Sequence, residues 1–162
     1  MNLKRLRTNL FVVFVLGLGL WSFAVRSVAQ TTTNGLGTVL VLDASGSMEG
    51  RVDDRTKTSL ARDASIGLME DLVEKGSSVG LVTFGDTSAT CQSARVAVPM
   101  LPGRLDDVVA TIERVRPQYR AQTPLLDALQ LAAEQAGPDG HVIAITDGID
   151  TCQLNPCDLP PS

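Results

Sequence analysis

The sequence predicts an α/β domain of the doubly wound, Rossmann-like kind, with a mostly parallel sheet. Strand-like and helix-like segments alternate along the chain, which is typical of parallel strands joined by right-handed crossovers. Three of the four predicted strands are continuous apolar runs, as expected of parallel strands that are covered on both faces. Counting the predicted strands along the chain, we expect the order 3-2-1-4, and 162 residues suit one such domain.

Residues 1–29 resemble a secretory signal peptide and are set apart from the fold. A basic start, "MNLKRLRTN", precedes the apolar run 10–25, and Ser27 and Ala29 are the small residues that favour cleavage after Ala29. The apolar run has 16 residues, fewer than the ~20 that a spanning helix needs. We therefore expect a secreted or periplasmic protein. The alternative is a membrane anchor formed by residues 10–25, which would then be its membrane contact.

The remaining chain is divided into a linker at 30–36, a domain at 37–158 and a tail at 159–162. The first predicted strand is Thr38–Asp43, "TVLVLD". The helix after it, Thr56–Glu74, carries a stripe of apolar residues at a spacing of four. That stripe consists of Leu60, Ala64, Leu68 and Leu72.

The second half of the domain repeats this alternation. Ser78–Gly85 is a buried strand, whereas Ala94–Met100 alternates and contains a proline, so it is expected as an antiparallel edge strand. Two further helices are predicted at Arg104–Val115 and Thr123–Gly137, the latter with Thr123 as its N-cap. The fourth strand is His141–Thr146.

Polar oxygens follow two of these strands. Asp43, Ser45 and Ser47 come directly after the first strand in "DASGS", and Asp147 follows the fourth strand in "ITDG". Ligands of open parallel sheets bind beyond the carboxyl ends of the strands, and Thr123 starts a helix at the same edge. Two carboxylates and three hydroxyls are hard donors, so they predict a site for Mg²⁺, Mn²⁺ or Ca²⁺. Neutral hydroxyls leave the ion electrophilic and able to accept an outside carboxylate.

The segments "VLVLDASGSM", "TPLLDAL" and "ITDG" resemble the metal-ion-dependent adhesion site of von Willebrand factor type A domains. "TKTSLARDA" and "VGLVTFG" are similar to the first helix and second strand of bacterial members. The resemblance implies that Asp43, Ser45, Ser47, Thr123 and Asp147 hold the ion directly or through water. It also implies a binding module whose protein partner presents an Asp or Glu to the ion.

The resemblance also implies two further strands and helices after the fourth strand. The chain ends without them, so the domain is expected to be truncated before its last two βα units.

The sequence leaves two alternative functions. A non-catalytic subunit or assembly factor of a larger complex is the first alternative, because domains of this family serve in such complexes. The second is a hydrolase that uses the Asp43 loop. A dehalogenase-like phosphatase needs an acid at position 45, where this chain has Ser45, and a serine hydrolase needs a Gly-x-Ser-x-Gly turn and a histidine base. We therefore expect no enzyme.

Charge and cysteines complete the prediction. The N-terminal 29 residues hold four of the 14 basic residues and no acid, so the rest is more acidic than the net charge of −4 indicates. Such a protein is not expected to bind nucleic acid. Asn155-Pro156 favours a turn, which predicts a local disulfide between Cys152 and Cys157. The alternative pairs Cys91 with one of them, because the loops after strands two and four open on one edge.

Overall fold

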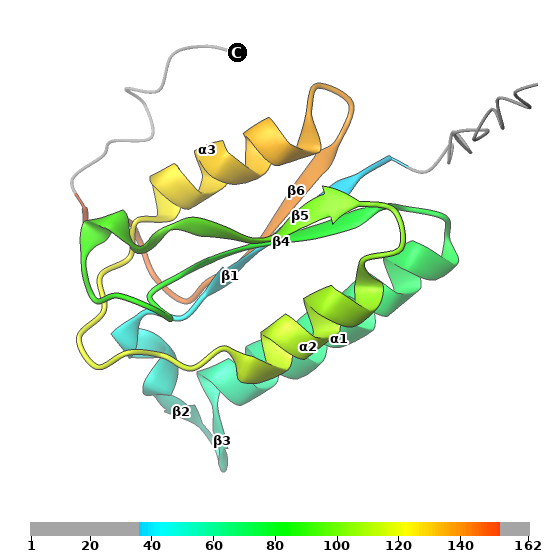
Figure 1. The fold of residues 1–162 in the computed structure, drawn as a ribbon. Helices are drawn as coiled ribbons and strands as arrows, with labels where there is room; N and C mark the ends of the chain where they lie inside the picture. Colours follow the sequence, from blue (N-terminus) through cyan, green and yellow to red (C-terminus); the bar gives the residue numbers. More distant parts are fainter. Residues whose placement is uncertain (1–35, 153–162) are drawn as a thin grey trace, which may run out of the picture. The chain divides into compact units, whose positions relative to one another are not determined.

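The computed structural model describes residues 36–152, and its centre is a four-stranded sheet (Figure 1). The strands are β1 (Thr38–Asp43), β4 (Val79–Phe84), β5 (Arg95–Leu101) and β6 (His141–Ile145), in the order β5-β4-β1-β6. β1 pairs in parallel with β4 and β6, whereas β5 is antiparallel to β4. The predicted fold class, the order 3-2-1-4 and the antiparallel third strand are confirmed.

Helices cover both faces of this sheet (Figure 1). α1 (Lys57–Glu74) and α2 (Leu105–Arg114) lie on one face, and α3 (Leu125–Ala136) lies on the other. Side chains of β1 alternate between the layers because successive residues of a strand point to opposite faces. Leu40 and Leu42 pack in the cluster with α1 and α2, whereas Val39 and Val41 pack in the cluster with α3. This alternation fixes the register of β1 and hence the position of Asp43 at its end.

The α1 stripe that the sequence predicts is confirmed only in its second half, where Leu68 and Leu72 pack against the core. The buried side chains of α1 are Thr58, Ala61, Ser65 and Met69. Leu60 is 36% exposed, and Ala64 is exposed as well. Two hydroxyls can replace aliphatic residues here because each is hydrogen-bonded. Thr58 donates to Met48 O (2.8 Å) and Ser65 to Ala61 O (2.6 Å).

Four short elements between the main ones were not predicted. A 3₁₀ helix, η1 (Gly46–Glu49), carries Ser47, and a second one, η2 (Cys91–Ser93), follows β4. Between η1 and α1 the chain forms a small hairpin of β2 (Arg51–Val52) and β3 (Arg55–Thr56). The hairpin leads into α1, where the Thr56 hydroxyl accepts a bond from Ser59 N (3.1 Å) and caps the helix.

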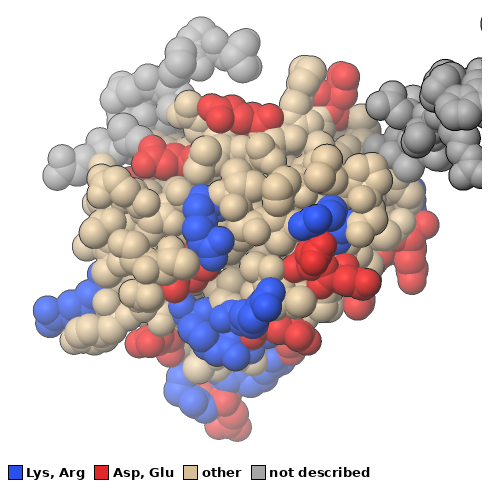
Figure 2. Space-filling model, viewed as in Figure 1, with Lys and Arg blue, Asp and Glu red and all other residues tan. Residues whose placement is uncertain are grey.

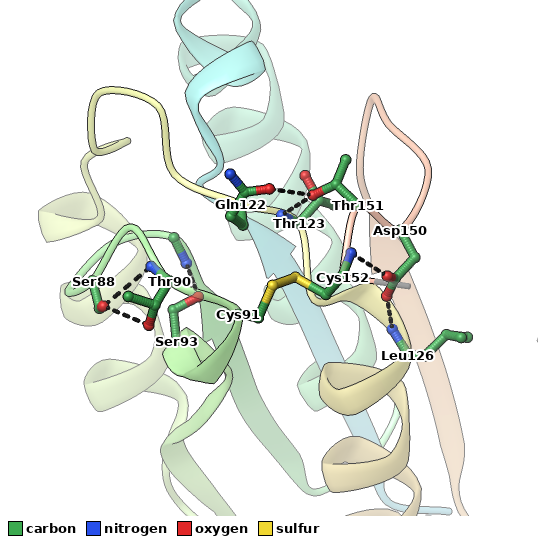
Figure 3. The surroundings of a disulfide bond; sticks show 11 residues. Ser88, Thr90, Cys91, Ser93, Gln122, Thr123, Leu126, Asp150, Thr151 and Cys152 are labelled. Atoms are coloured by element: carbon green, nitrogen blue, oxygen red, sulfur yellow. Dashed lines mark hydrogen bonds between the residues drawn. A yellow bond between two sulfur atoms is a disulfide. The ribbon is translucent and has the colours of Figure 1, made fainter. Parts of the chain in front are cut away.

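The predicted local disulfide is wrong, because Cys152 is joined to Cys91 (Figure 3). The two residues are 61 apart in the sequence, and their Cα atoms lie 5.7 Å from each other. The loops after β4 and β6 open on the same edge, and within the second loop Asp150 accepts a bond from Cys152 N (2.7 Å). Cys157 lies outside the described residues.

The signal peptide, most of the linker and the tail also lie outside the described residues. Within 36–152, none of the helices combines the length and the apolar character that crossing a membrane requires.

Candidate metal-ion site

The candidate site lies where β1 and β6 end side by side. These strands run in parallel with Leu42 opposite Ile145, so the residues that follow them share one edge of the sheet. Asp43 is the last residue of β1, and Asp147 lies two residues after the end of β6. The structure therefore brings together two acids that are far apart in the sequence.

Hydrogen bonds join four of the five predicted site residues into one cluster. Ser45 N donates to Asp43 Oδ1 (2.6 Å), and the Ser45 and Ser47 hydroxyls lie 3.1 Å apart. The Ser47 hydroxyl donates to Asp147 Oδ1 at 2.7 Å. The Asp-x-Ser-x-Ser spacing thus brings the oxygens of Asp43, Ser45 and Ser47 close together at the end of β1.

Asp43 is the buried member of this cluster, with no exposed surface. A buried carboxylate is costly unless hydrogen bonds satisfy its oxygens. Here Oδ1 accepts from Ser45 N, and Oδ2 accepts from the Thr146 hydroxyl at 2.6 Å. Thr146 was not predicted as part of the site; it bonds Asp43 directly and so fixes the orientation of this carboxylate. Ser47, by contrast, is exposed and can reach solvent.

Backbone contacts place Thr123 beside the cluster. Gly46 N donates to Ala121 O (3.2 Å), and a Cβ at Gly46 would lie 3.0 Å from Arg120 N, so a larger residue would push these two loops slightly apart. Thr123 N donates to the Thr151 hydroxyl (2.9 Å), and Thr151 N donates to Thr123 O (3.1 Å; Figure 3). Thr123, 5% exposed, is thereby fixed to the loop that carries Asp147.

The predicted N-cap role of Thr123 is wrong. α3 begins at Leu125 after Pro124, and the residue that supports its first turn is Asp150, whose Oδ2 accepts from Leu126 N at 3.0 Å (Figure 3). An acid suits this position because the amino end of a helix is electropositive. Since Asp150 supplies this bond from the loop after β6, the Thr123 hydroxyl does not serve as the cap.

A basic residue, Lys57, contacts the site and was missed by the sequence analysis. Its ammonium forms an ion pair with Asp147 Oδ2, and the Asp147 side chain is 16% exposed. Burial raises the pKa of Asp147. The hydrogen bonds from Lys57 and Ser47 and the positive charge of Lys57 together lower it by more, so the pKa lies below its usual value. Asp147 is therefore ionised at neutral pH.

The donor chemistry of this cluster fits a hard divalent cation. Two carboxylates and the hydroxyls of Ser45, Ser47 and Thr123 are all oxygen donors, as Mg²⁺ and Mn²⁺ prefer. No group of three or more His, Cys, Asp or Glu side chains suited to a metal occurs between residues 36 and 152. The cluster has only two carboxylates, so any ion held here depends on hydroxyl oxygens.

A family model described as the von Willebrand factor type A domain matches residues 38–149, more than half of the chain. The chain belongs to the von Willebrand factor type A family. The match covers β1 through β6 and includes all five predicted site residues. No curated protein matches the sequence.

Solved structures share this type A fold at low sequence identity. An aerotolerance-related membrane protein from Bacteroides fragilis is 22% identical, with a TM-score of 0.56 over 72% of this chain and 56% of that one. The PilB minor pilin from Streptococcus sanguinis is also 22% identical, with a TM-score of 0.52 over 71% of this chain and 30% of that one. BatB from Bacteroides thetaiotaomicron is 20% identical, with a TM-score of 0.52 and coverages of 68% and 52%. This chain thus spans between about a third and just over half of each, and the likeness concerns the fold alone.

Proposed function

We propose that this type A domain is an exported, non-catalytic module that binds a protein partner through a divalent cation. Asp43, Ser45, Ser47, Thr123 and Asp147 would hold Mg²⁺ or Mn²⁺, with Ca²⁺ as the other candidate. The ion would supply an electrophilic contact for an Asp or Glu of the partner. The observation that carries the proposal is the hydrogen-bonded cluster of Asp43, Ser45, Ser47 and Asp147 at one edge of the sheet.

Basic side chains near this edge support an acidic partner. A hollow of about 400 Å³ is lined by Arg95, Arg114 and Arg116, together with Asp86. The segment after Arg116 is anchored on the loop after β4, because Gln118 N donates to Gly85 O at 3.0 Å. Figure 2 shows Lys and Arg side chains in the lower half of the view, in the region of α1, α2 and the β2–β3 hairpin, with Asp and Glu side chains among them. A carboxylate-bearing partner would meet these charges as it approaches the ion.

A binding role is proposed in preference to catalysis for a geometric reason. His141, the one histidine of the chain, begins β6 opposite Thr38, whereas Ser45 and Ser47 lie beyond the other end of β1. A serine nucleophile needs a base within hydrogen-bond reach. His141 lies at the opposite end of the sheet and does not suit that role.

Export is proposed from two features. Residues 1–29 have the composition of a signal peptide, and the Cys91–Cys152 disulfide suits an oxidising compartment outside the cytoplasm.

Calorimetric titration with Mn²⁺ tests the ion site. The wild-type protein is expected to bind one ion, and Asp43→Ala is expected to bind none, because the buried carboxylate of the site is gone. Asp139→Ala is the control, since this acid is exposed in the turn before β6, at the other end of the strand. Equal binding by wild type and Asp43→Ala would refute the assignment.

Capture experiments then test the partner. Immobilised protein is exposed to an extracellular or periplasmic fraction in Mg²⁺ or in EDTA. A partner of the proposed kind is retained by the wild type in Mg²⁺ and lost both in EDTA and with Asp43→Ala. If the partner is still retained in EDTA and by Asp43→Ala, the contact is not mediated by the ion.

A further inference from the structure

The ion pair between Lys57 and Asp147 lies inside the candidate site. Asp147 Oδ1 accepts from Ser47, and Oδ2 faces the Lys57 ammonium, so both oxygens of this carboxylate are already engaged. The Lys57 side chain is 35% exposed, so part of it reaches solvent. The ammonium therefore has a route by which it can leave Asp147.

Lys57 occupies an unfavourable position within its own helix. It is the first residue of α1, whose first turn contains no acid. The amino end of a helix is electropositive, so a cation there is destabilising unless something else compensates it. Lys75, the other lysine in the described part, follows the carboxyl end of α1 and pairs with Asp71 one turn away, where a cation is favoured. The compensation for Lys57 comes from Asp147, 90 residues away in the sequence.

The loop before α1 also holds Lys57 against the site. Lys57 N donates to Gly50 O at 2.8 Å. A Cβ placed on Gly50 would lie 3.4 Å from Lys57 Cε and 3.6 Å from Nζ, so the ammonium lies over the glycine that ends η1. η1 is the element that carries Ser47. In the absence of an ion the ammonium thus lies against Asp147 and close to the element that carries Ser47.

We infer that Lys57 is a built-in counter-ion of this site, which neutralises Asp147 when no metal is bound and is displaced when a divalent cation binds. The inference rests on the proposed ion site and adds a residue that sets its affinity. An ammonium and a divalent cation on one carboxylate repel each other, so binding requires the Lys57–Asp147 contact to break. Lys57 therefore weakens ion binding, and it keeps the cluster assembled in the absence of the ion.

Replacing Lys57 by an uncharged residue of similar length tests this directly. Removing one charge at a few ångströms from a divalent ion is expected to tighten Mn²⁺ binding of Lys57→Met by about fivefold to twentyfold. Arg55→Met is the matched control, because Arg55 lies two residues earlier but pairs with Asp63 instead. An equal gain in Arg55→Met, or no gain in Lys57→Met, would overturn the inference.

Amine labelling of the wild-type protein gives a second measurement that needs no variant. Mn²⁺ is expected to raise the rate of reductive methylation of Lys57 several-fold and to leave Lys75 unchanged, as read by mass spectrometry of peptides. If calorimetry shows that Mn²⁺ binds but the methylation rate of Lys57 does not change, the inference is overturned while the ion site is retained. Tighter binding by Lys57→Met than by the wild type would support both. No binding by either protein would overturn both.

Discussion

Cys91 and Cys152 form a disulfide that joins η2, after β4, to the loop after β6. Thr151, next to Cys152, exchanges two hydrogen bonds with the backbone of Thr123. The disulfide, the Thr123 loop and the Asp147 loop are therefore parts of one connected edge. Changes to the crosslink are expected to affect both the stability of the fold and the ion site.

Reduction of the disulfide is expected to lower the free energy of unfolding. The crosslink closes a loop between residues 61 apart, for which the chain-entropy account gives an upper value of about 4 kcal/mol. Urea unfolding with and without dithiothreitol measures the loss. In the double variant Cys91→Ser/Cys152→Ser, dithiothreitol should change nothing. Non-reducing peptide maps should contain a crosslinked Cys91 peptide, and a Cys152–Cys157 peptide as the main product would contradict the pairing.

The Thr123 hydroxyl is expected to matter for the ion and little for α3. Thr123→Val keeps the shape of the side chain but loses the oxygen, so Mn²⁺ affinity should fall about tenfold or more, while Thr123→Ser should retain most of it. Since Asp150 rather than Thr123 bonds the first turn of α3, the melting temperature of the valine variant in EDTA should stay close to that of the wild type. Wild-type affinity in Thr123→Val would remove this residue from the ligand set.

Asp147 is expected to make stability depend on pH in the acid range. Its pKa is lowered in the folded protein, so its contribution is present above the unfolded carboxyl pKa of about 3.9 and is lost as the pH falls through the lower folded value. In EDTA at pH 7, Asp147→Asn should lose about 0.5–1 kcal/mol, because the Lys57 side chain of the pair is 35% exposed and solvent screens the interaction. The difference should shrink as the pH falls below the unfolded carboxyl pKa and the carboxylate becomes protonated. A difference that grows on acidification would contradict the lowered pKa.

Sequence patterns predicted the elements that hydrophobic burial determines. The apolar runs at Thr38–Asp43 and Val79–Phe84 are fully buried strands. The polar residues after the first and fourth strands meet as expected, since the Ser47 hydroxyl bonds Asp147. The β2–β3 hairpin was missed because "RVDDRT" has no apolar pattern and turns through Asp53, a non-glycine residue with a φ of 53°. The wrong disulfide and the wrong N-cap were both predicted from a local turn or cap signal. In each case the actual partner is distant in sequence. Lys57 bonds a residue 90 positions away, which no local pattern shows.

Gly85 is expected to be required for the shape of the Asp43 loop. Its φ is +76°, and an added Cβ would lie 2.6 Å from Ala44 O and 2.7 Å from Ser45 N. Gly85→Ala should therefore cost about 2 kcal/mol or more and weaken Mn²⁺ binding, because the loop that carries Ser45 must move. Gly67→Ala is the control: this glycine lies within α1 with no atom within 4 Å of its added Cβ, so the change should stabilise by up to about 1 kcal/mol. Chemical unfolding and calorimetry of both variants measure these effects.

The cluster joins residues that are synthesised far apart in time, because they are distant in the sequence. Ser47 and Asp147 lie 100 positions apart, and Asp43 and Thr146 lie 103 apart. A chain that emerges from its amino end, during synthesis or translocation, carries the Asp43 loop long before Asp147 follows. Contacts at such separation form only after the intervening strands and helices have brought the ends together. If the proposed ion is held by both acids, its binding would require a completely folded domain, and a partner that needs the ion would bind folded domains but not nascent chains.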